Sequence, residues 1–230
     1  MKHTPTAVSQ IETFALEQEL VTGAQSLSLK LTKLQIEQII EYVKLLHKWS
    51  AVYNLTAIKS SEDILVQHIM DCLSIIQPIL QRFKSGISIL DVGSGAGLPA
   101  VMIAIACPEH KVTALDAVAK KVAFIKQASL LLNLPNLSAK HGRVERECNQ
   151  KYDLIVSRAF SSLNKFVNES MGALVNGGVW MAMKGKLPVE EMTLLPLDVS
   201  VFDVTHPKVP GMLSERCLVW MSKGESLGKH

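Results

Sequence analysis

The feature that most constrains the fold is a glycine-rich turn between a short apolar segment and a helix-like run. The turn reads Asp-Val-Gly-Ser-Gly-Ala-Gly over residues 91–97, at the end of an apolar strand at 87–92 and before a helical run at 99–107. Glycine lacks a Cβ, so a ligand can approach the backbone closely at such a turn. The helix that follows adds free N–H groups. Glycine turns also serve packing alone, so the context of this one decides between the two roles.

After residue 86, strand-like and helix-like segments alternate along the chain. We expect strands at 87–92, 111–116, 137–141, 152–157, 179–183, 199–204 and 216–221, and helices at 99–107 and 119–133. Gly177 and Gly178 are expected to break the chain before the fifth strand. The last two strands have no helix between them and are expected to form a hairpin at the sheet edge. This alternation predicts an α/β fold with a parallel, doubly wound sheet.

The first 85 residues read as helical. Thr32 and Gln35 fit a capping box that starts one helix. Ser60 is a candidate cap for a second helix at 64–79, and a third is possible at 11–20. The 230 residues are too few for two full domains. We therefore expect a helical N-terminal extension over 1–85, packed on an α/β domain over 86–230.

Composition and charge permit an RNA-binding protein and argue against a membrane-spanning or secreted one. Apolar residues make up 48% of the chain, and the net charge of +3 permits RNA binding without requiring it. No apolar stretch reaches the ~18 residues of a membrane span. Residues 1–10 lack the basic start and apolar run of a signal peptide. We therefore expect a cytoplasmic protein that does not contact a membrane.

The four cysteines give no metal signal. They are Cys72, Cys107, Cys148 and Cys217. None forms a Cys-x-x-Cys pair, and no histidine is expected at zinc spacing beside one. All four are interpreted as buried apolar residues, and no metal site is expected.

The turn favours one cofactor class over another. A dinucleotide pattern starting at Gly93 requires glycine at position 98, where Leu98 stands. The pattern present, Asp-x-Gly-x-Gly-x-Gly, looks like the first motif of class I methyltransferases, which use S-adenosylmethionine. Asp116 ends the second strand about 20 residues later and suits ribose hydroxyls, with a helix cap as its alternative role. Asp91 is expected to orient the turn or to contact the methionine ammonium.

The residues at the end of the fourth strand limit which kind of atom can accept the methyl group. Enzymes that methylate exocyclic amines often carry Asn-Pro-Pro-Tyr there, whereas this chain has Ser-Arg-Ala-Phe at 157–160. No cysteine stands there for attack on C5 of a pyrimidine. The pattern favours an acceptor atom that needs no deprotonation, and guanine N7 is such an atom.

Several segments, taken in order, resemble the bacterial RsmG family, also called glucose-inhibited division protein B. They are Leu-His-Lys-Trp at 46–49, Tyr-Asn-Leu-Thr-Ala at 53–57, His68, Asp71, Leu73, Gly-Ser-Gly-Ala-Gly-Leu-Pro at 93–99, Arg-Val-Glu at 143–145, Ser-Arg-Ala-Phe at 157–160 and Lys-Gly at 184–185. The resemblance spans roughly residues 30–221. Ser50, Cys72 and Ala100 depart from the family pattern. The resemblance to this family implies a class I, Rossmann-like methyltransferase that methylates N7 of a guanine in 16S ribosomal RNA.

Eight residues are the expected cofactor contacts, some from the turn and some from the resemblance. They are Asp91, Gly93, Gly95, Leu98, Asp116, Val144, Glu145 and Arg158. Arg158 is also the candidate catalytic residue, because its strand end opens on the crevice where ligands bind. His68 is interpreted as a hydrogen-bonded core histidine, with a functional role as the alternative.

Four further residues are expected to bind the substrate. They are Arg143, Phe160, Lys184 and Lys186, with Lys208 as a further phosphate contact. Phe160 is expected to stack on the base and the cations to meet phosphates. The expected partner is 16S ribosomal RNA or the small ribosomal subunit, with the chain acting as a monomer. Two alternatives stay open, a small-molecule methyltransferase with a helical lid and a non-catalytic nucleotide-binding module.

Overall fold

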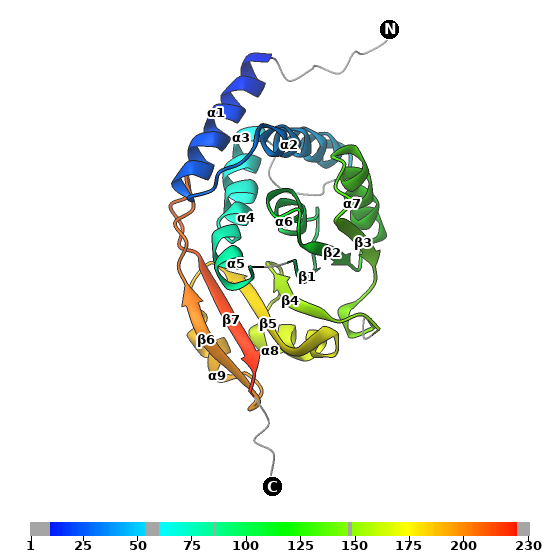
Figure 1. The fold of residues 1–230 in the computed structure, drawn as a ribbon, viewed down its shortest axis with the longest axis vertical. Helices are drawn as coiled ribbons and strands as arrows, with labels where there is room; N and C mark the ends of the chain where they lie inside the picture. The colour runs from blue at the N-terminus through cyan, green and yellow to red at the C-terminus, as the bar shows by residue number, and fades with distance from the viewer. Residues whose placement is uncertain (1–9, 54–59, 85, 147–148, 225–230) are drawn as a thin grey trace.

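A seven-stranded sheet forms the centre of the molecule (Figure 1). The computed structural model describes residues 10–53, 60–84, 86–146 and 149–224. The strands are β1 (Ser88–Val92), β2 (Lys111–Asp116), β3 (Leu137–His141), β4 (Tyr152–Ser157), β5 (Leu174–Lys184), β6 (Val199–Thr205) and β7 (Cys217–Lys223). Their order across the sheet is β3-β2-β1-β4-β5-β7-β6.

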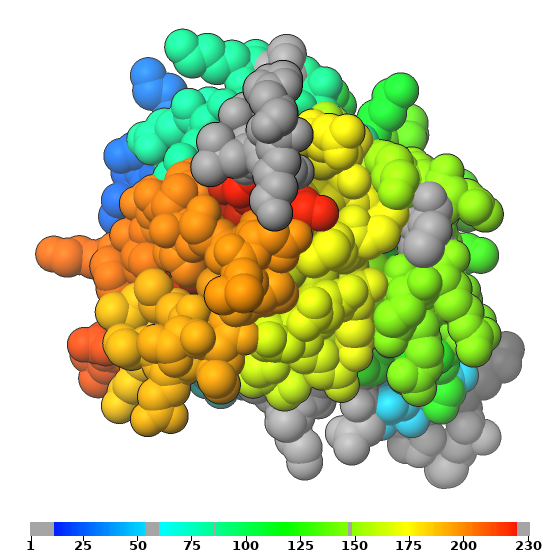
Figure 2. Space-filling model, turned by 90° about the horizontal axis from the view of Figure 1, so that it is seen from below, coloured from blue at the N-terminus to red at the C-terminus, as the bar shows by residue number. Residues whose placement is uncertain are grey.

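The parallel half of the sheet agrees with the sequence prediction. In the other half, β7 lies between β5 and β6. β1 to β5 pair in parallel, so the predicted α/β fold is confirmed. β6 and β7 pair antiparallel, as expected of a hairpin, and β7 also pairs antiparallel with β5. β7 therefore lies inside the sheet, and of the two hairpin strands only β6 is at a sheet edge. In the view from below, β7 shows only as a small red area among orange and yellow segments (Figure 2).

The prediction that two glycines break the chain before the fifth strand is wrong. Gly177 and Gly178 lie inside β5. Two steps along β4, from Tyr152 to Leu154, pair with five steps along β5, from Leu174 to Val179. The extra residues bulge out of the ladder, and Gly177 takes a positive φ of 77° there. A glycine pair in a strand can thus mark a bulge rather than an end.

Helices cover both faces of the sheet. The helices after β1 are α6 (Ala100–Ala106), α7 (Ala119–Leu131), α8 (Leu163–Ser170) and α9 (Val189–Thr193), with short 3-10 turns at Val144–Arg146 and Met171–Ala173. Neighbouring strand residues point to opposite faces, so Ile89 belongs to one hydrophobic cluster and Leu90 to the other. α8 was not predicted from the sequence. Its N-cap is Ser162, whose hydroxyl accepts a hydrogen bond from Lys165 N at 3.3 Å.

The N-terminal part of the described chain is helical, as expected. Its helices are α1 (Gln10–Ser26), α2 (Lys33–Tyr53), α3 (Ser61–Ile64), the π-helical turn η1 (Leu65–Met70), α4 (Asp71–Leu73) and α5 (Ile76–Arg82). The predicted capping box is confirmed, because Thr32 N donates to Gln35 Oε1 at 2.9 Å and Gln35 N donates to Thr32 Oγ1 at 3.3 Å. Ser60 caps the second helix through Asp63 N at 3.0 Å. The segment at 54–57, part of the family resemblance, lies outside the described residues.

These helices share one hydrophobic core with the sheet. Leu20 and Leu46 belong to the same buried cluster as Ile89 and Trp220. A boundary at residue 85 therefore stays a prediction about domain organisation. Within the described residues, one helical stretch, Ser61–Arg82, is long and apolar enough to cross a membrane, and 61% of its apolar window is buried in the fold. A core helix of a globular protein has the same composition.

Candidate active site

The glycine turn is held by both the end of β2 and the packing beneath it. Gly93 N and Ser94 N donate to the carbonyl of Leu115 at 2.9 and 3.0 Å. Gly97 has a φ of 86°, and a Cβ there would lie 2.8 Å from Val101 Cγ2. A side chain at 97 is therefore excluded by both the backbone and the packing.

Asp91 supports the turn from below. Its side chain is fully buried, and Oδ2 accepts a hydrogen bond from Ala100 N at 3.0 Å. Oδ1 has no hydrogen-bond partner among the described residues. Burial raises the pKa of Asp91 to about 7. Of its two expected roles, the geometry supports orientation of the turn and of the first residues of α6.

Asp116 connects the end of β2 to the turn. Its Oδ2 accepts a hydrogen bond from Gly95 N at 2.8 Å, and its Oδ1 accepts one from Val118 N at 2.9 Å. The N-cap residue of α7 is Val118, so Asp116 itself does not occupy the cap position. Asp116 is nearly buried yet still lines a cavity beside the turn.

That cavity, which we call the turn cavity, has a volume of about 140 Å³. Its lining residues are Val92, Gly93, Leu115, Asp116, Ala117, Gly142, Arg143, Val144, Glu145, Phe160 and Glu169. Four predicted cofactor contacts therefore meet here, together with two residues predicted to bind substrate. Phe160 packs against Phe166, with ring centroids 5.2 Å apart, and so forms an apolar wall of this cavity.

Four other predicted cofactor contacts do not line the turn cavity. Asp91 and Leu98 are buried beneath the turn, and Leu98 is only 3% exposed. Gly95 uses its N–H for Asp116. Arg158 lines a different cavity. Asp91, Gly95 and Leu98 therefore shape the turn, whereas Arg158 faces the other cavity.

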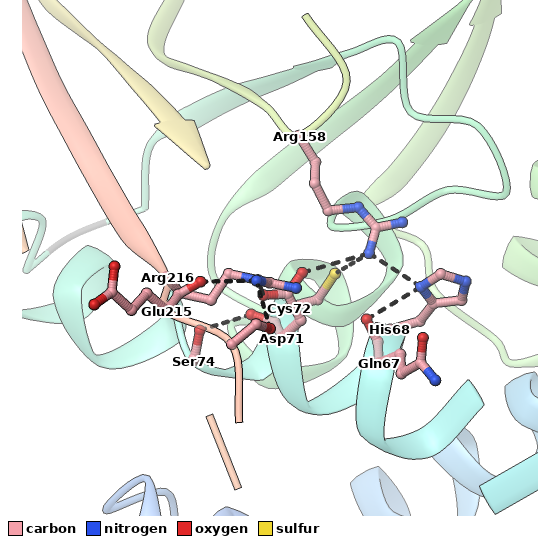
Figure 3. Close-up of polar contacts among 9 residues, drawn as sticks. Gln67, His68, Asp71, Cys72, Ser74, Arg158, Glu215 and Arg216 are labelled. Carbon is pink, nitrogen blue, oxygen red and sulfur yellow. Dashed lines mark hydrogen bonds and ion pairs between the residues drawn. The ribbon is translucent and has the colours of Figure 1, made fainter. Parts of the chain in front are cut away.

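The second cavity, which we call the arginine cavity, has a volume of about 350 Å³. It is lined by Gln67, His68, Asp71, Arg158, Met183, Lys184, Gly185 and Arg216. Arg158 follows the last residue of β4, and its Nη1 lies 3.7 Å from Asp71 Oδ2 and 3.4 Å from His68 Nδ1 (Figure 3). Arg216, just before β7, donates from Nε to Asp71 Oδ1 at 2.9 Å.

The titratable groups around Arg158 are poor bases at neutral pH. Burial and the nearby Arg158 lower the pKa of His68 to about 4, so its imidazole is neutral and weakly basic. Burial raises the pKa of the Cys72 thiol to about 12, so the thiol stays protonated. Asp71 is occupied by two arginines.

Lys184 also lines the arginine cavity, but its charge is already paired. Its Nζ lies 2.8 and 3.1 Å from the two carboxylate oxygens of Glu191 and donates to the carbonyl of Phe160 at 3.3 Å. The other predicted RNA contacts, Arg143, Lys186 and Lys208, are exposed. Lys186 and Lys208 line neither cavity.

Three residues at the site were not assigned a role from the sequence. Asp71 and Arg216 meet across 145 positions of the chain. Tyr42, on α2, donates from its hydroxyl to the carbonyl of Ala96 in the turn at 2.6 Å. Asp71 stands in a segment of the family resemblance, but no spacing pattern connects it to Arg216 or connects Tyr42 to the turn.

The expectation that no histidine stands at zinc spacing beside a cysteine is wrong for Cys107. Cys107 and His110 form a Cys-x-x-His pair, and their ligand atoms and that of Glu109 lie within 4.8 Å of one another. Ile87 N donates to His110 Nδ1 at 3.4 Å, which places the imidazole proton on Nε2, the nitrogen that faces Glu109 at 3.8 Å. Nε2 therefore has no lone pair to offer a metal. Cys72, Cys107 and Cys217 are buried free thiols, as expected, and Cys148 lies outside the described residues.

Two solved structures with the same fold are methyltransferases. Ribosomal protein L11 methylase from Lactobacillus delbrueckii aligns with a TM-score of 0.52 at 15% identity, over 66% of this chain and 77% of that one. Coclaurine N-methyltransferase, bound to N-methylheliamine and S-adenosylhomocysteine, aligns with a TM-score of 0.51 at 16% identity, over 84% of this chain and 72% of that one. Together with the glycine turn after β1, this fold is that of the class I S-adenosylmethionine-dependent methyltransferases.

Sequence relatives define the family within that class. The chain matches the model of the family described as rRNA small subunit methyltransferase G over residues 35–219, and it belongs to that family. A Polaromonas sp. relative named ribosomal RNA small subunit methyltransferase G is 50% identical over 89% of this chain and 92% of its own. A relative of the same name from Methylibium petroleiphilum is 46% identical over 94% and 98%. The predicted resemblance and fold class are therefore confirmed.

Proposed function

We propose that the chain transfers the methyl group of S-adenosylmethionine to N7 of a guanine in the 16S RNA of the small ribosomal subunit. The names of its relatives support a small-subunit RNA substrate. The observation that supports N7 is the chemistry of the arginine cavity. Among its described lining residues, His68 is weakly basic and Asp71 is bound by two arginines. Guanine N7 has a free lone pair and no proton to lose, so it needs no general base.

The turn cavity fits the nucleoside part of this cofactor. Asp116 and Glu145 offer carboxylates for hydroxyl or amino groups, and Val144 and Phe160 offer apolar surfaces for a flat base. When bound, the cofactor supplies an electrophilic methyl group on a sulfonium. We assign Asp91, Gly95 and Leu98 to the shape of the turn, because they are buried or already hydrogen-bonded.

The chain's own contribution to catalysis is positioning, which can supply ~7–11 kcal/mol of the barrier. Arg158 faces the arginine cavity with a charged, forked donor, and we assign it to guanine O6 or to a phosphate of the target nucleotide. N7 remains unblocked in either arrangement. The product base is cationic, so no anion has to be stabilised as the methyl group moves.

The phosphates of the RNA backbone would contact the exposed cationic side chains. Arg143, Lys186 and Lys208 are exposed and suit contacts to phosphates. Lys184 instead donates directly to the Phe160 carbonyl and pairs with Glu191. Phe160 serves better as a wall for the cofactor than as a stacking surface for the target base, since it packs on Phe166.

We also propose that the chain acts as a monomer in the cytoplasm, where ribosomal subunits are found. Among the described residues, the most exposed large apolar side chains, Leu130, Leu197 and Leu213, lie on different segments. Sedimentation at micromolar concentration is expected to give the mass of one chain.

The test of the proposed function is to map the methylated atom. Small ribosomal subunits and bare 16S RNA from a strain that lacks this enzyme are incubated with the chain and labelled cofactor. Reduction followed by aniline treatment cleaves RNA at N7-methylguanine, and one new cleavage site is expected. Label in the RNA without a cleavage site would contradict the N7 assignment. Label found only in a pool of small metabolites would favour the small-molecule alternative.

A further inference from the structure

Asp71 is a buried carboxylate that holds two arginines at once. Its Oδ1 accepts from Arg216 Nε at 2.9 Å, and its Oδ2 lies 3.7 Å from Arg158 Nη1. Its side chain is only 6% exposed, whereas those of the arginines are 24% and 27% exposed. Figure 3 shows the two arginines approaching this carboxylate from opposite sides. Asp71 therefore uses both of its oxygens to hold the two arginines.

Three separate elements converge on this carboxylate. Arg158 follows β4, Arg216 precedes β7, and Asp71 starts α4 directly after the π-helical turn η1. A π-helical turn inserts a residue into a helix and is frequent at functional sites. The next helical residues are fixed too, because Ser74 donates from its hydroxyl to the carbonyl of Asp71 at 2.7 Å.

Each guanidinium keeps part of its donor set for a ligand. Arg216 uses Nη1 for Ser214 Oγ at 3.0 Å and for the Glu215 carbonyl at 2.8 Å. Arg158 uses Nη1 for Asp71, His68 and Cys72. The Nη2 groups of both arginines have no hydrogen-bond partner among the described residues.

The charges of the cavity favour a singly charged anion. Arg158, Arg216 and Lys184 bring three positive charges, and Asp71 and Glu191 bring two negative ones. His68 is neutral at pH 7. The remaining positive charge matches one phosphodiester, which is the charge that one nucleotide of an RNA chain carries.

We propose that Asp71 is a positioning residue, which holds Arg158 and Arg216 so that their outer N–H groups receive the target guanine nucleotide in the orientation for methyl transfer. This inference rests on the proposed function, because it assumes an RNA nucleotide in the arginine cavity. Asp71 acts only through the two arginines, so its effect on catalysis should depend on them.

The first test is Asp71→Asn, measured with small-subunit RNA and S-adenosylmethionine. A misplacement of about 1 Å costs on the order of a hundredfold in rate, so kcat is expected to fall by about that factor. KM for RNA should stay the same or fall, because the variant loses a negative charge near the RNA. S-adenosylhomocysteine affinity should stay within about twofold, since it binds at the other cavity.

The matched control is Asp198→Asn. Asp198 also pairs with a cation, Lys223 at 3.4 Å, but both side chains are about half exposed and lie outside the two cavities. Its kcat and KM should match those of the wild type. An unchanged kcat for Asp71→Asn, or a raised KM with an unchanged kcat, would overturn the inference alone. A wild-type chain that methylates no ribosomal RNA would instead contradict the proposed function.

The second test does not depend on the folding of Asp71→Asn. Arg216→Lys keeps the charge at a partly exposed position but removes the Nε donor and the fork. Its kcat should fall with little change in melting temperature. In the double variant with Asp71→Asn, the two losses in kcat should be far less than multiplicative, because both changes remove the same contact between Asp71 and Arg216. Independent, multiplicative losses, or an Arg216→Lys chain with wild-type kcat, would show that Asp71 does not act through Arg216.

Discussion

The hydroxyl of Tyr42 donates a hydrogen bond to the carbonyl of Ala96 at 2.6 Å. Tyr42 lies on α2 and is fully buried, while Ala96 lies in the glycine turn. The ring of Tyr42 also packs near Phe124 of α7, with centroids 6.0 Å apart. The N-terminal helices therefore fix the conformation of the cofactor turn directly, which would be unexpected for a mobile lid over a small pocket.

Replacing Tyr42 with Phe should weaken both the fold and cofactor binding. The Ala96 carbonyl would lose its partner, which costs about 1 kcal/mol of unfolding free energy, and a looser turn should reduce S-adenosylhomocysteine affinity severalfold. Calorimetric titration and thermal melting measure the two effects. Tyr152→Phe is the matched control, because the buried Tyr152 hydroxyl has no hydrogen-bond partner among the described residues. Equal effects of the two changes would contradict a specific role for Tyr42.

Asp116→Ala should impair the turn itself as well as a ribose contact. The variant loses the acceptor of Gly95 N, and charge-assisted hydrogen bonds are worth about 1.5–3 kcal/mol each. Cofactor affinity measured by calorimetry should fall by a corresponding factor, and the fold should survive because the residue ends a strand. Asp198→Ala serves as the surface control. An unchanged affinity would limit Asp116 to the support of Val118 at the start of α7.

The cofactor class can be tested by thermal shift. A ligand at 100 times its Kd stabilises the folded state by about 2.7 kcal/mol, which raises the melting temperature by several degrees in a domain of this size. S-adenosylmethionine and S-adenosylhomocysteine should both produce this shift, and NAD should not. A shift with NAD alone would mean that the glycine turn binds a dinucleotide.

The buried Asp91 and the partly buried His68 give opposite contributions to the free energy of unfolding as pH changes. Burial raises the pKa of Asp91 to about 7, so its contribution is complete at low pH and is lost as pH rises through 7. The N–H of Ala100 and the nearby Arg158 lower this pKa, whereas Asp116 raises it. Burial and Arg158 lower the pKa of His68 to about 4, so its contribution is lost as pH falls from 6.5 through 4.

The two contributions partly cancel between pH 4 and 6.5. Asp91→Asn removes the first of them, so the unfolding free energy of the variant should rise more steeply with pH over this range than that of the wild type. Melting temperatures at several pH values measure the slope, independently of any overall loss of stability. A slope equal to that of the wild type would mean that Asp91 is ionised in the folded chain throughout this range.

The exposed and the paired lysine at the end of β5 should differ in salt dependence. Lys186→Ala should reduce the slope of log affinity for RNA against log salt by about one, because an exposed cation releases about one counterion. Lys184→Met should change that slope much less, since Glu191 already neutralises its amine at 2.8 Å. Filter binding at several salt concentrations distinguishes the two. An equal change in both slopes would show that the pair opens when RNA binds.

The parallel half of the fold could be predicted closely because its signals are local. β2, β3 and β4 begin and end at the predicted residues. α8 was missed because it is only eight residues long, although its buried Leu163, Phe166 and Val167 stand at the i, i+3, i+4 spacing of a helix face. Gly177 was misinterpreted because a glycine looks the same in a bulge as at a strand end.

The candidate site likewise has features that local motifs predict and features that depend on tertiary packing. The turn cavity was largely predictable, because Gly93 and Asp116 belong to motifs with a regular spacing. The neutralisation of Lys184 was not, since it depends on how α9 packs Glu191 against β5. The contact between Asp71 and Arg216 joins residues 145 positions apart, and no local pattern in one sequence reports such a contact.

The insertion of β7 between β5 and β6 has a consequence for the order of folding. The pairing of β1 with β2 joins residues 23 positions apart, Ile89 and Val112, and its pairing with β4 joins residues 65 positions apart, Ile89 and Leu154. The contact between Asp71 and Arg216 joins residues 145 positions apart. β6 pairs only with β7, and Arg216 can reach Asp71 only after β7 has paired with β5. Contacts between such distant segments form slowly, because the long loop between them has to close first. A refolding chain should thus regain affinity for S-adenosylhomocysteine before it regains the ability to methylate RNA.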